Sequence, residues 1–97
     1  MSMTVLLEMT LRPDATEAQS IISETLAQTR AYSGNEGIEV LVDDDDSAKL
    51  VVVETWESTA HHAAYAEWRT TPEGQNRLGE IVAAPPVKRI FSETLDI

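Results

Sequence analysis

The chain has 97 residues, 42% hydrophobic and 25% charged, so a single domain spanning residues 1–97 with one modest core is expected. The formal net charge of −10 argues against nucleic acid and anionic membranes as partners, because both attract positive protein surfaces. The sequence contains no cysteine, which excludes disulfides and thiolate metal sites. We find no signal-peptide pattern and no apolar run of roughly 20 residues, so the expected location is the cytoplasm.

The N-terminal third predicts a strand followed by a helix. Apolar residues alternate over residues 3–12, which is the period of a strand with one buried face. Asp14 and Glu17 then have the spacing of a capping box, which predicts a helix N-terminus. Apolar residues at helical spacing continue to Thr29, and Gly34 is the expected helix C-cap, with residues 33–37 forming a loop.

Two further strands are predicted at residues 38–42 and 49–57, on either side of the acidic run at residues 43–46. We interpret this run as a solvated hairpin turn. A calcium loop would need acidic residues at alternate positions, a glycine and a distant glutamate, and these are missing.

The second helical region is predicted in two pieces. Ser58 caps a helix that runs to about residue 70, and Thr71 followed by Pro72 indicates a new helix start. The prolines at positions 85 and 86 end this region, and residues 87–95 form the last strand. The apolar side of the second piece consists of Leu78, Ile81 and Val82.

The element order is β-α-β-β-α-β with a split second helix, which is typical of a ferredoxin-like α+β sandwich. Such a sheet carries helices on one face and is normally polar on the other. Residues 50–53 are apolar on both faces of their strand. A second copy of the chain is the simplest cover for the extra apolar face, so we predict a homodimer built sheet against sheet.

Aromatic and titratable side chains concentrate between residues 54 and 69. A helical projection at about 100° per residue places one stripe of residues toward the sheet and a second group at the edge of that stripe. The small alanines in the inner stripe should let the helix approach the sheet closely. The inner stripe consists of Ala60, His61, Ala64, Tyr65 and Trp68, and the edge consists of His62 and Arg69. Trp56 ends the preceding strand.

These residues predict a pocket with a base and polar anchors. Either His61 or His62 could act as a general base near neutral pH. Tyr65 could orient or protonate a substrate oxygen, and Arg69 could hold an oxyanion or a carboxylate.

Three neighbouring residues keep two interpretations each. Trp56 and Trp68 fit core and pocket wall equally well. Glu54 is a buried partner of Arg69 or a histidine if its face points at the helices, and an exposed edge residue otherwise. Metal binding is not expected, because adjacent histidines diverge on a helix, and no nucleophile elbow, GxGxxG or P-loop is present.

The sequence VVVETWES at residues 51–58, followed after a helix by WRTTP at residues 68–72, resembles the antibiotic biosynthesis monooxygenase family. The resemblance implies a small dimeric α+β barrel. It also implies oxygenation of quinols or polycyclic aromatics by molecular oxygen without a cofactor. Trp56 matches the family's strand-end tryptophan. A histidine is frequent in the family about where Tyr65 stands here, so a histidine role would pass to His61 or His62.

A branch of the same fold degrades haem with an asparagine on the first strand and a histidine ligand one helix later. This chain has Leu7, Glu8 and Met9 on that strand and Ala66 near the ligand position, so haem degradation is disfavoured. The favoured hypothesis is a cofactor-independent monooxygenase that acts on a small aromatic or quinol. The alternative is a non-catalytic dimer that binds a small hydrophobic ligand.

Overall fold

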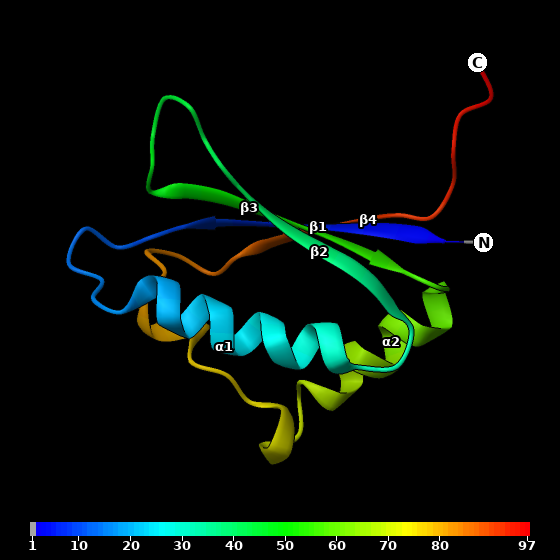
Figure 1. The fold of residues 1–97 in the computed structure, drawn as a ribbon, viewed down its shortest axis with the longest axis horizontal. Helices are drawn as coiled ribbons and strands as arrows, with labels where there is room; N and C mark the ends of the chain where they lie inside the picture. Colours follow the sequence, from blue (N-terminus) through cyan, green and yellow to red (C-terminus); the bar gives the residue numbers. More distant parts are fainter. Residues whose placement is uncertain (1) are drawn as a thin grey trace.

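The fold, described here for residues 2–97 in a computed structural model, is a four-stranded antiparallel sheet with helices on one face (Figure 1). The strand order is β2-β3-β1-β4. This arrangement confirms the predicted ferredoxin-like α+β fold. The elements in chain order are β1 (Met3–Thr10), α1 (Ala18–Ala31), β2 (Asn35–Val42), β3 (Lys49–Trp56), α2 (Thr59–Trp68), the 3₁₀ turns η1 (Pro72–Gly74) and η2 (Leu78–Glu80), and β4 (Val87–Phe91).

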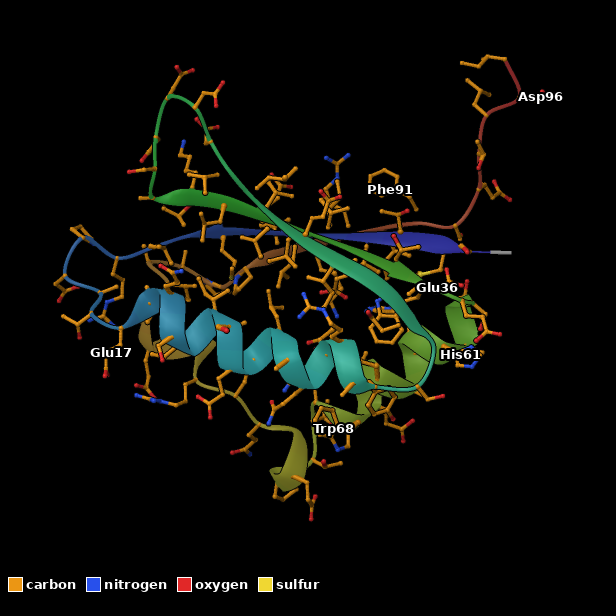
Figure 2. All side chains as sticks on the ribbon, in the orientation of Figure 1. Glu17, Glu36, His61, Trp68, Phe91 and Asp96 are labelled. Atoms are coloured by element: carbon orange, nitrogen blue, oxygen red, sulfur yellow. The ribbon has the colours of Figure 1, made fainter. Side chains whose placement is uncertain are left out.

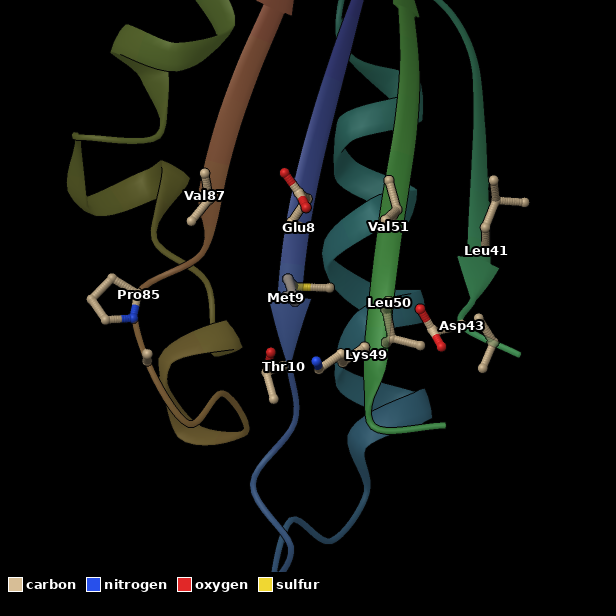
Figure 3. A pocket seen from close by; sticks show the side chains of 12 residues that line it. Glu8, Met9, Thr10, Leu41, Asp43, Lys49, Leu50, Val51, Pro85 and Val87 are labelled. Carbon is tan, nitrogen blue, oxygen red and sulfur yellow. The ribbon is translucent and has the colours of Figure 1, made fainter. Parts of the chain in front are cut away.

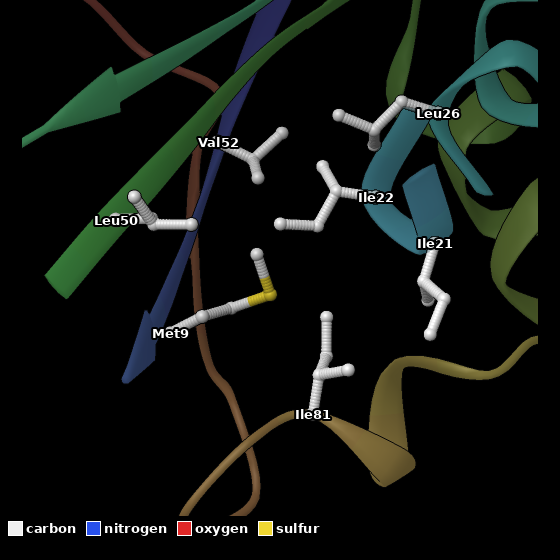
Figure 4. Close-up of a cluster of buried hydrophobic side chains, with 7 residues drawn as sticks. All are labelled: Met9, Ile21, Ile22, Leu26, Leu50, Val52 and Ile81. Atoms are coloured by element: carbon white, nitrogen blue, oxygen red, sulfur yellow. The ribbon is translucent and has the colours of Figure 1, made fainter. Parts of the chain in front are cut away.

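The main core lies between the sheet and α1 (Figure 4). Alternate residues of β1 and β3 point into it, as the sequence period predicts. Ile81, which follows η2, is only 1% exposed and closes the core from the far side. The members of this cluster are Met9, Ile21, Ile22, Leu26, Leu50, Val52 and Ile81.

A second cluster of aromatic side chains joins α2 to the end of the sheet. Trp56 is fully buried, and its ring centroid lies 4.9 Å from that of Tyr65. Tyr32, at the end of α1, packs 5.4 Å from both Tyr65 and Trp68. This packing fixes the position of α2 against β3.

The predicted capping box at the start of α1 is wrong. The helix begins at Ala18, and its N-cap residue Glu17 has a left-handed backbone (φ 58°) without a side-chain cap hydrogen bond. Asp14 instead lies 3.4 Å from the Arg12 guanidinium. The Arg12 backbone N–H donates to the carbonyl of Ile81, so the end of β1 is tied to the segment after η2 before the chain reaches α1.

Several element boundaries also differ from the predictions. The residue that caps the end of α1 is Tyr32, while Gly34 forms the following turn with φ 94°. β2 starts at Asn35, within the predicted loop, and contains a bulge before Gly37. β4 ends at Phe91, four residues earlier than predicted.

The second piece of the split helix forms two short 3₁₀ turns instead of a helix. Thr71 precedes η1 as predicted, but its hydroxyl donates to the Trp68 carbonyl at 2.7 Å and does not cap the turn. Gly74 packs so closely on the carbonyl of Trp68 that a Cβ atom has no room. This contact folds the segment back against the end of α2.

The sheet face opposite the helices has no cover within residues 2–97 (Figures 1 and 2). Phe91 points away from the helices on this side. Leu41, Val87 and Phe91 are 51%, 57% and 43% exposed. Pairing across the strands places Leu6, Val51 and Val53 on the same face. No helix within the described residues is long and apolar enough to cross a membrane.

Candidate functional site

A cavity of about 360 Å³ lies between the helix-facing side of the sheet, α1, α2 and the segment around η2. Its walls are apolar with a few converging polar groups, which is the usual composition of a small-molecule site. The lining residues are Val5, Leu7, Thr25, Leu26, Thr29, Glu54, His62, Tyr65, Ala66, Arg69, Asn76, Leu78, Gly79, Pro86 and Lys88.

The structure exchanges the predicted positions of the two histidines, since His61 was expected on the inner stripe and His62 at the edge. His62 is 4% exposed and lines the cavity, whereas His61 lies at the outer edge of α2 (Figure 2). The His61 Nδ1 atom is 2.6 Å from the Ser58 hydroxyl, and its Nε2 atom is 3.6 Å from Glu57. Ser58 also accepts the backbone N–H of His61, as its predicted role as N-cap requires. The ring of His61 therefore belongs to the helix cap.

The cavity-facing stripe of α2 is His62, Tyr65, Ala66 and Arg69, at spacing i, i+3, i+4 and i+7. The predicted inner stripe of the projection is therefore wrong by about one residue. Ala60 and Ala64, which were expected to approach the sheet, are exposed. The contact between α2 and the sheet is made by the aromatic cluster around Trp56 and Tyr65. Close approach of the backbones is therefore not needed, and the alanines can face solvent.

Arg69 uses all five of its N–H groups in hydrogen bonds within the chain. Its Nε donates to the Tyr65 hydroxyl at 2.7 Å. The terminal nitrogens donate to the Thr25 carbonyl at 2.9 Å, Thr29 Oγ1 at 3.0 Å, Gln28 Oε1 at 2.9 Å and the Gly74 carbonyl at 3.2 Å. A guanidinium has five N–H donors. Arg69 thus ties α2 to α1 and η1, and no donor is left for a substrate.

The Tyr65 hydroxyl is also engaged. It accepts from Arg69 and lies 2.7 Å from Thr29 Oγ1. Because Thr29 donates to the Thr25 carbonyl at 3.2 Å, the Tyr65 hydroxyl donates to Thr29. Thr29 was not singled out from the sequence, because its contact partners lie 36 and 40 residues away.

Glu54 is a buried carboxylate, 4% exposed, on the helix-facing side of β3, as one of the two interpretations of the sequence predicted. It accepts a hydrogen bond from Trp56 Nε1 at 2.9 Å. Burial raises the pKa of Glu54, while this hydrogen bond and the charges of Lys88 and Arg69 act against the increase. Burial lowers the pKa of His62, and the positive charge of Lys88 lowers it further.

The two tryptophans support the cavity from behind. Trp56 lies 5.6 Å from the His62 ring, centroid to centroid, and is fully buried. Trp68 stacks against the Arg69 guanidinium at 4.9 Å. Neither belongs to the residues that line the cavity. Both therefore position the polar groups that do.

Lys88, on β4, lines the cavity and was missed from the sequence. It pairs with Leu7 across the sheet and so lies on the helix-facing side. The available signal was the strand period, because Lys88 lies between Val87 and Arg89 and must point to the opposite face of β4. Among residues 2–97 no cluster of three or more His, Asp or Glu side chains is arranged to hold a metal ion.

The fold and the cavity define a small ferredoxin-like α+β protein with a site for a small molecule between sheet and helices. The chain belongs to the antibiotic biosynthesis monooxygenase family, whose model matches residues 2–82. No curated protein matches the sequence at a significant level.

Solved structures show the same fold. SnoaB from Streptomyces nogalater, described as a cofactor-independent oxygenase, superposes with a TM-score of 0.77 at 16% identity, over 99% of this chain and 96% of that chain. Rv0793 from Mycobacterium tuberculosis gives 0.76 at 23% identity, over 99% and 98%. A putative antibiotic biosynthesis monooxygenase from Nitrosomonas europaea gives 0.73 at 20% identity, over 95% and 89%. At these identities the likeness concerns the fold.

Proposed function

We propose that this chain is a cytoplasmic, homodimeric, cofactor-independent monooxygenase that acts on a small aromatic or quinol substrate in the cavity. Family membership and the cofactor-independent oxygenase among the solved structures of the same fold support the reaction class. The observation that carries the proposal is the pairing, in one largely apolar cavity, of a buried neutral base with positive charge.

In the proposed reaction His62 takes the proton of a substrate phenol. Its lowered pKa keeps the ring unprotonated near neutral pH, so it is ready to accept a proton. The resulting anion delocalises charge onto a ring carbon, which supplies the electrons that reduce molecular oxygen. A C–O bond forms between this ring carbon and one oxygen atom, and the O–O bond breaks. The hydrogen of that carbon and the phenolic proton, returned by His62, leave with the other oxygen atom as water, so the phenol and O₂ give a quinone and one water.

The test is oxygen consumption with a panel of hydroquinones and anthrone-type phenols, comparing His62→Ala with His61→Ala. The two histidines are neighbours in sequence, but only His62 lines the cavity. We expect a loss of about 100-fold or more for His62→Ala and near wild-type rates for His61→Ala. The assignment fails if the wild type consumes no oxygen, or if both variants behave alike with melting temperatures near that of the wild type.

A non-catalytic ligand-binding protein is the second candidate, and one observation favours it. The polar groups of Tyr65, His61 and Arg69 are all hydrogen-bonded within the chain, as in a rigid binding pocket. The open cavity beside Tyr65 and His62 favours the enzyme. Haem degradation stays disfavoured, since Ala66 lines the cavity near the position where that branch has its histidine ligand.

The homodimer is part of the proposal, and the uncovered face of the sheet supports it. A row of side chains crosses all four strands beside a hollow of about 430 Å³; it consists of the apolar Val87, Val51 and Leu41, with the carboxylate of Glu8 between Val87 and Val51 (Figure 3). Exposed apolar side chains contiguous over a sheet are typical of an interface. A second copy, placed sheet against sheet by a twofold axis, would bury the same row on both chains.

Analytical ultracentrifugation at micromolar concentration tests the dimer. Val53→Asp places a charge in the middle of the uncovered face and should produce monomers. Ala63→Asp adds the same charge on the exposed side of α2 and should leave the dimer intact. A monomeric wild type, or a dimeric Val53→Asp protein, would contradict the proposed interface.

A further inference from the structure

We infer that the cavity selects an aromatic anion, and that the ammonium group of Lys88, not the guanidinium of Arg69, holds the anionic oxygen. This names the substrate class of the same cavity and rests on the proposed function for the identity of the site. The substrate class is a phenolate or an enolate, with its charged oxygen toward β4 and its ring in the apolar part of the cavity.

Arg69 is the obvious anion anchor by residue type, but its contacts exclude this role. All five N–H groups are already donated, and every acceptor is a neutral oxygen. An arginine binds an oxyanion through N–H donors, usually in pairs. To bind a substrate, Arg69 would have to give up bonds it already makes, either to Thr25 and Thr29, which are 4% and 0% exposed, or to Gln28 and the Gly74 carbonyl nearer solvent.

Lys88 has the opposite properties. It lines the cavity, and the three ion pairs within residues 2–97 all involve other residues. No side-chain hydrogen bond of the described residues uses its ammonium group, whose three N–H donors are therefore available. β4 is exposed along its length, so the Lys88 side chain reaches the cavity from its rim and can meet an entering ligand.

The charges around the cavity agree with this assignment. The titratable groups that line it are Glu54, His62, Tyr65, Arg69 and Lys88. Arg69 and Lys88 carry positive charge, Glu54 is the single acidic residue, and its pKa is raised by burial. The cavity is therefore locally positive in a chain whose net charge is −10. A low-dielectric pocket with one sign of charge concentrates ligands of the other sign.

The probe is 4-nitrophenol, whose phenolate absorbs visible light and whose methyl ether, 4-nitroanisole, has nearly the same shape but cannot ionise. The pH titration of the bound phenol is followed by absorbance in wild type, Lys88→Met, Lys88→Arg and Arg89→Met. Arg89 is the matched control, because it is the neighbouring cation on the same strand but lies on the opposite face of the sheet. Binding of 4-nitroanisole reports whether each variant keeps the cavity.

The wild type should lower the pKa of the bound phenol and bind its phenolate about tenfold more tightly than 4-nitroanisole, since a nearby cation stabilises the charged form. Lys88→Met should remove both effects while 4-nitroanisole still binds, Lys88→Arg should restore them, and Arg89→Met should match the wild type. The inference is overturned if the wild type binds no phenolate, if the bound phenol keeps its pKa, or if Lys88→Met behaves like the wild type.

These outcomes separate the inference from the proposed function. If the protein binds phenolate selectively through Lys88 but consumes no oxygen with any phenol, the proposed monooxygenase function is wrong and the anion site stands. If the Lys88→Met protein consumes oxygen at the wild-type rate, the anion site at Lys88 is wrong and the proposed monooxygenase function stands.

Discussion

Replacing Arg69 by methionine is expected to cost about 3–4 kcal/mol of folding free energy. Three of its five hydrogen bonds end on the Thr25 carbonyl, Thr29 Oγ1 and the Tyr65 hydroxyl, in residues that are 4%, 0% and 9% exposed. The three acceptors stay bonded to one another through Thr29, so the loss is that of three hydrogen bonds from a charged donor, at about 1 kcal/mol or slightly more each. The bonds to Gln28 and Gly74 lie nearer solvent and add little, because water can replace them.

The assay is urea unfolding followed by tryptophan fluorescence, with thermal melting at the same protein concentration. A small domain has about 5–15 kcal/mol in total, so Arg69→Met should still fold but with its melting temperature lowered by about 12 °C or more. Arg77→Met is the control, because its guanidinium pairs with Glu80 on the surface, and its melting temperature should stay near that of the wild type. Arg69→Lys keeps the charge but not the five donors and should lie between wild type and methionine.

A loss below about 1 kcal/mol for Arg69→Met, or full stability in Arg69→Lys, would refute the reasoning. Either result would mean that the hydrogen bonds do not hold α2 to α1. Arg69 would then again be available as a substrate anchor.

Further predictions concern pH and backbone strain. Because the native state holds the Glu54 proton more tightly than the unfolded chain, the contribution of Glu54 to stability should fall as pH rises above the ordinary carboxyl value of 4.5. In urea unfolding, the stability difference between wild type and Glu54→Gln should therefore shift against the wild type as pH rises. Because the native state disfavours charged His62, the contribution of His62 to stability should fall as pH drops below 6.5, so the stability difference between wild type and His62→Gln should shift against the wild type as pH falls. Gly34→Ala should destabilise by about 1–2 kcal/mol, since φ is 94° and a Cβ atom would meet the His61 side chain, whereas Gly37→Ala has open space. A stable Gly34→Ala protein would contradict the steric account.

The strand period predicted the sheet well, because burial on one or both faces leaves a direct mark in sequence. Alternation over β1 and β3 agrees with the faces in the structure, where Val5 lies opposite Glu54 and Leu7 opposite Val52. That register also decides between the two interpretations of Glu54, since it lies on the same side as Val52 and Trp56. The helix start at Asp14 failed because a tertiary contact, the hydrogen bond between Arg12 and Ile81, directs the chain there.

The histidine pair shows why a helical projection alone misplaced the two imidazole rings. Both histidines are polar, so polarity does not tell which one faces inward. A helical projection that places the alanines against the sheet also ignores the hydrogen bonds of the N-cap residue. These hydrogen bonds decide the orientation. The Ser58 hydroxyl accepts the backbone N–H of His61 at 3.1 Å and lies 2.6 Å from the His61 Nδ1 atom, so the His61 side chain turns back toward the start of the helix. The next position, His62, then points inward with Tyr65. A Ser-x-x-His spacing before an aromatic residue was the usable signal.

Residue type alone does not show whether Arg69 or Lys88 has N–H donors free for a ligand. Arginine is the better oxyanion ligand in general, yet here its donors are consumed by acceptors on α1 and η1 that lie 5, 40, 41 and 44 residues away in sequence. Lys88 lies on the exposed edge strand β4, where no sequence motif marks a site. Among the described residues its ammonium group has no hydrogen-bond or ion-pair partner. The free donors of Lys88 therefore support the proposal that β4 recognises the anion, with the proposed base on α2.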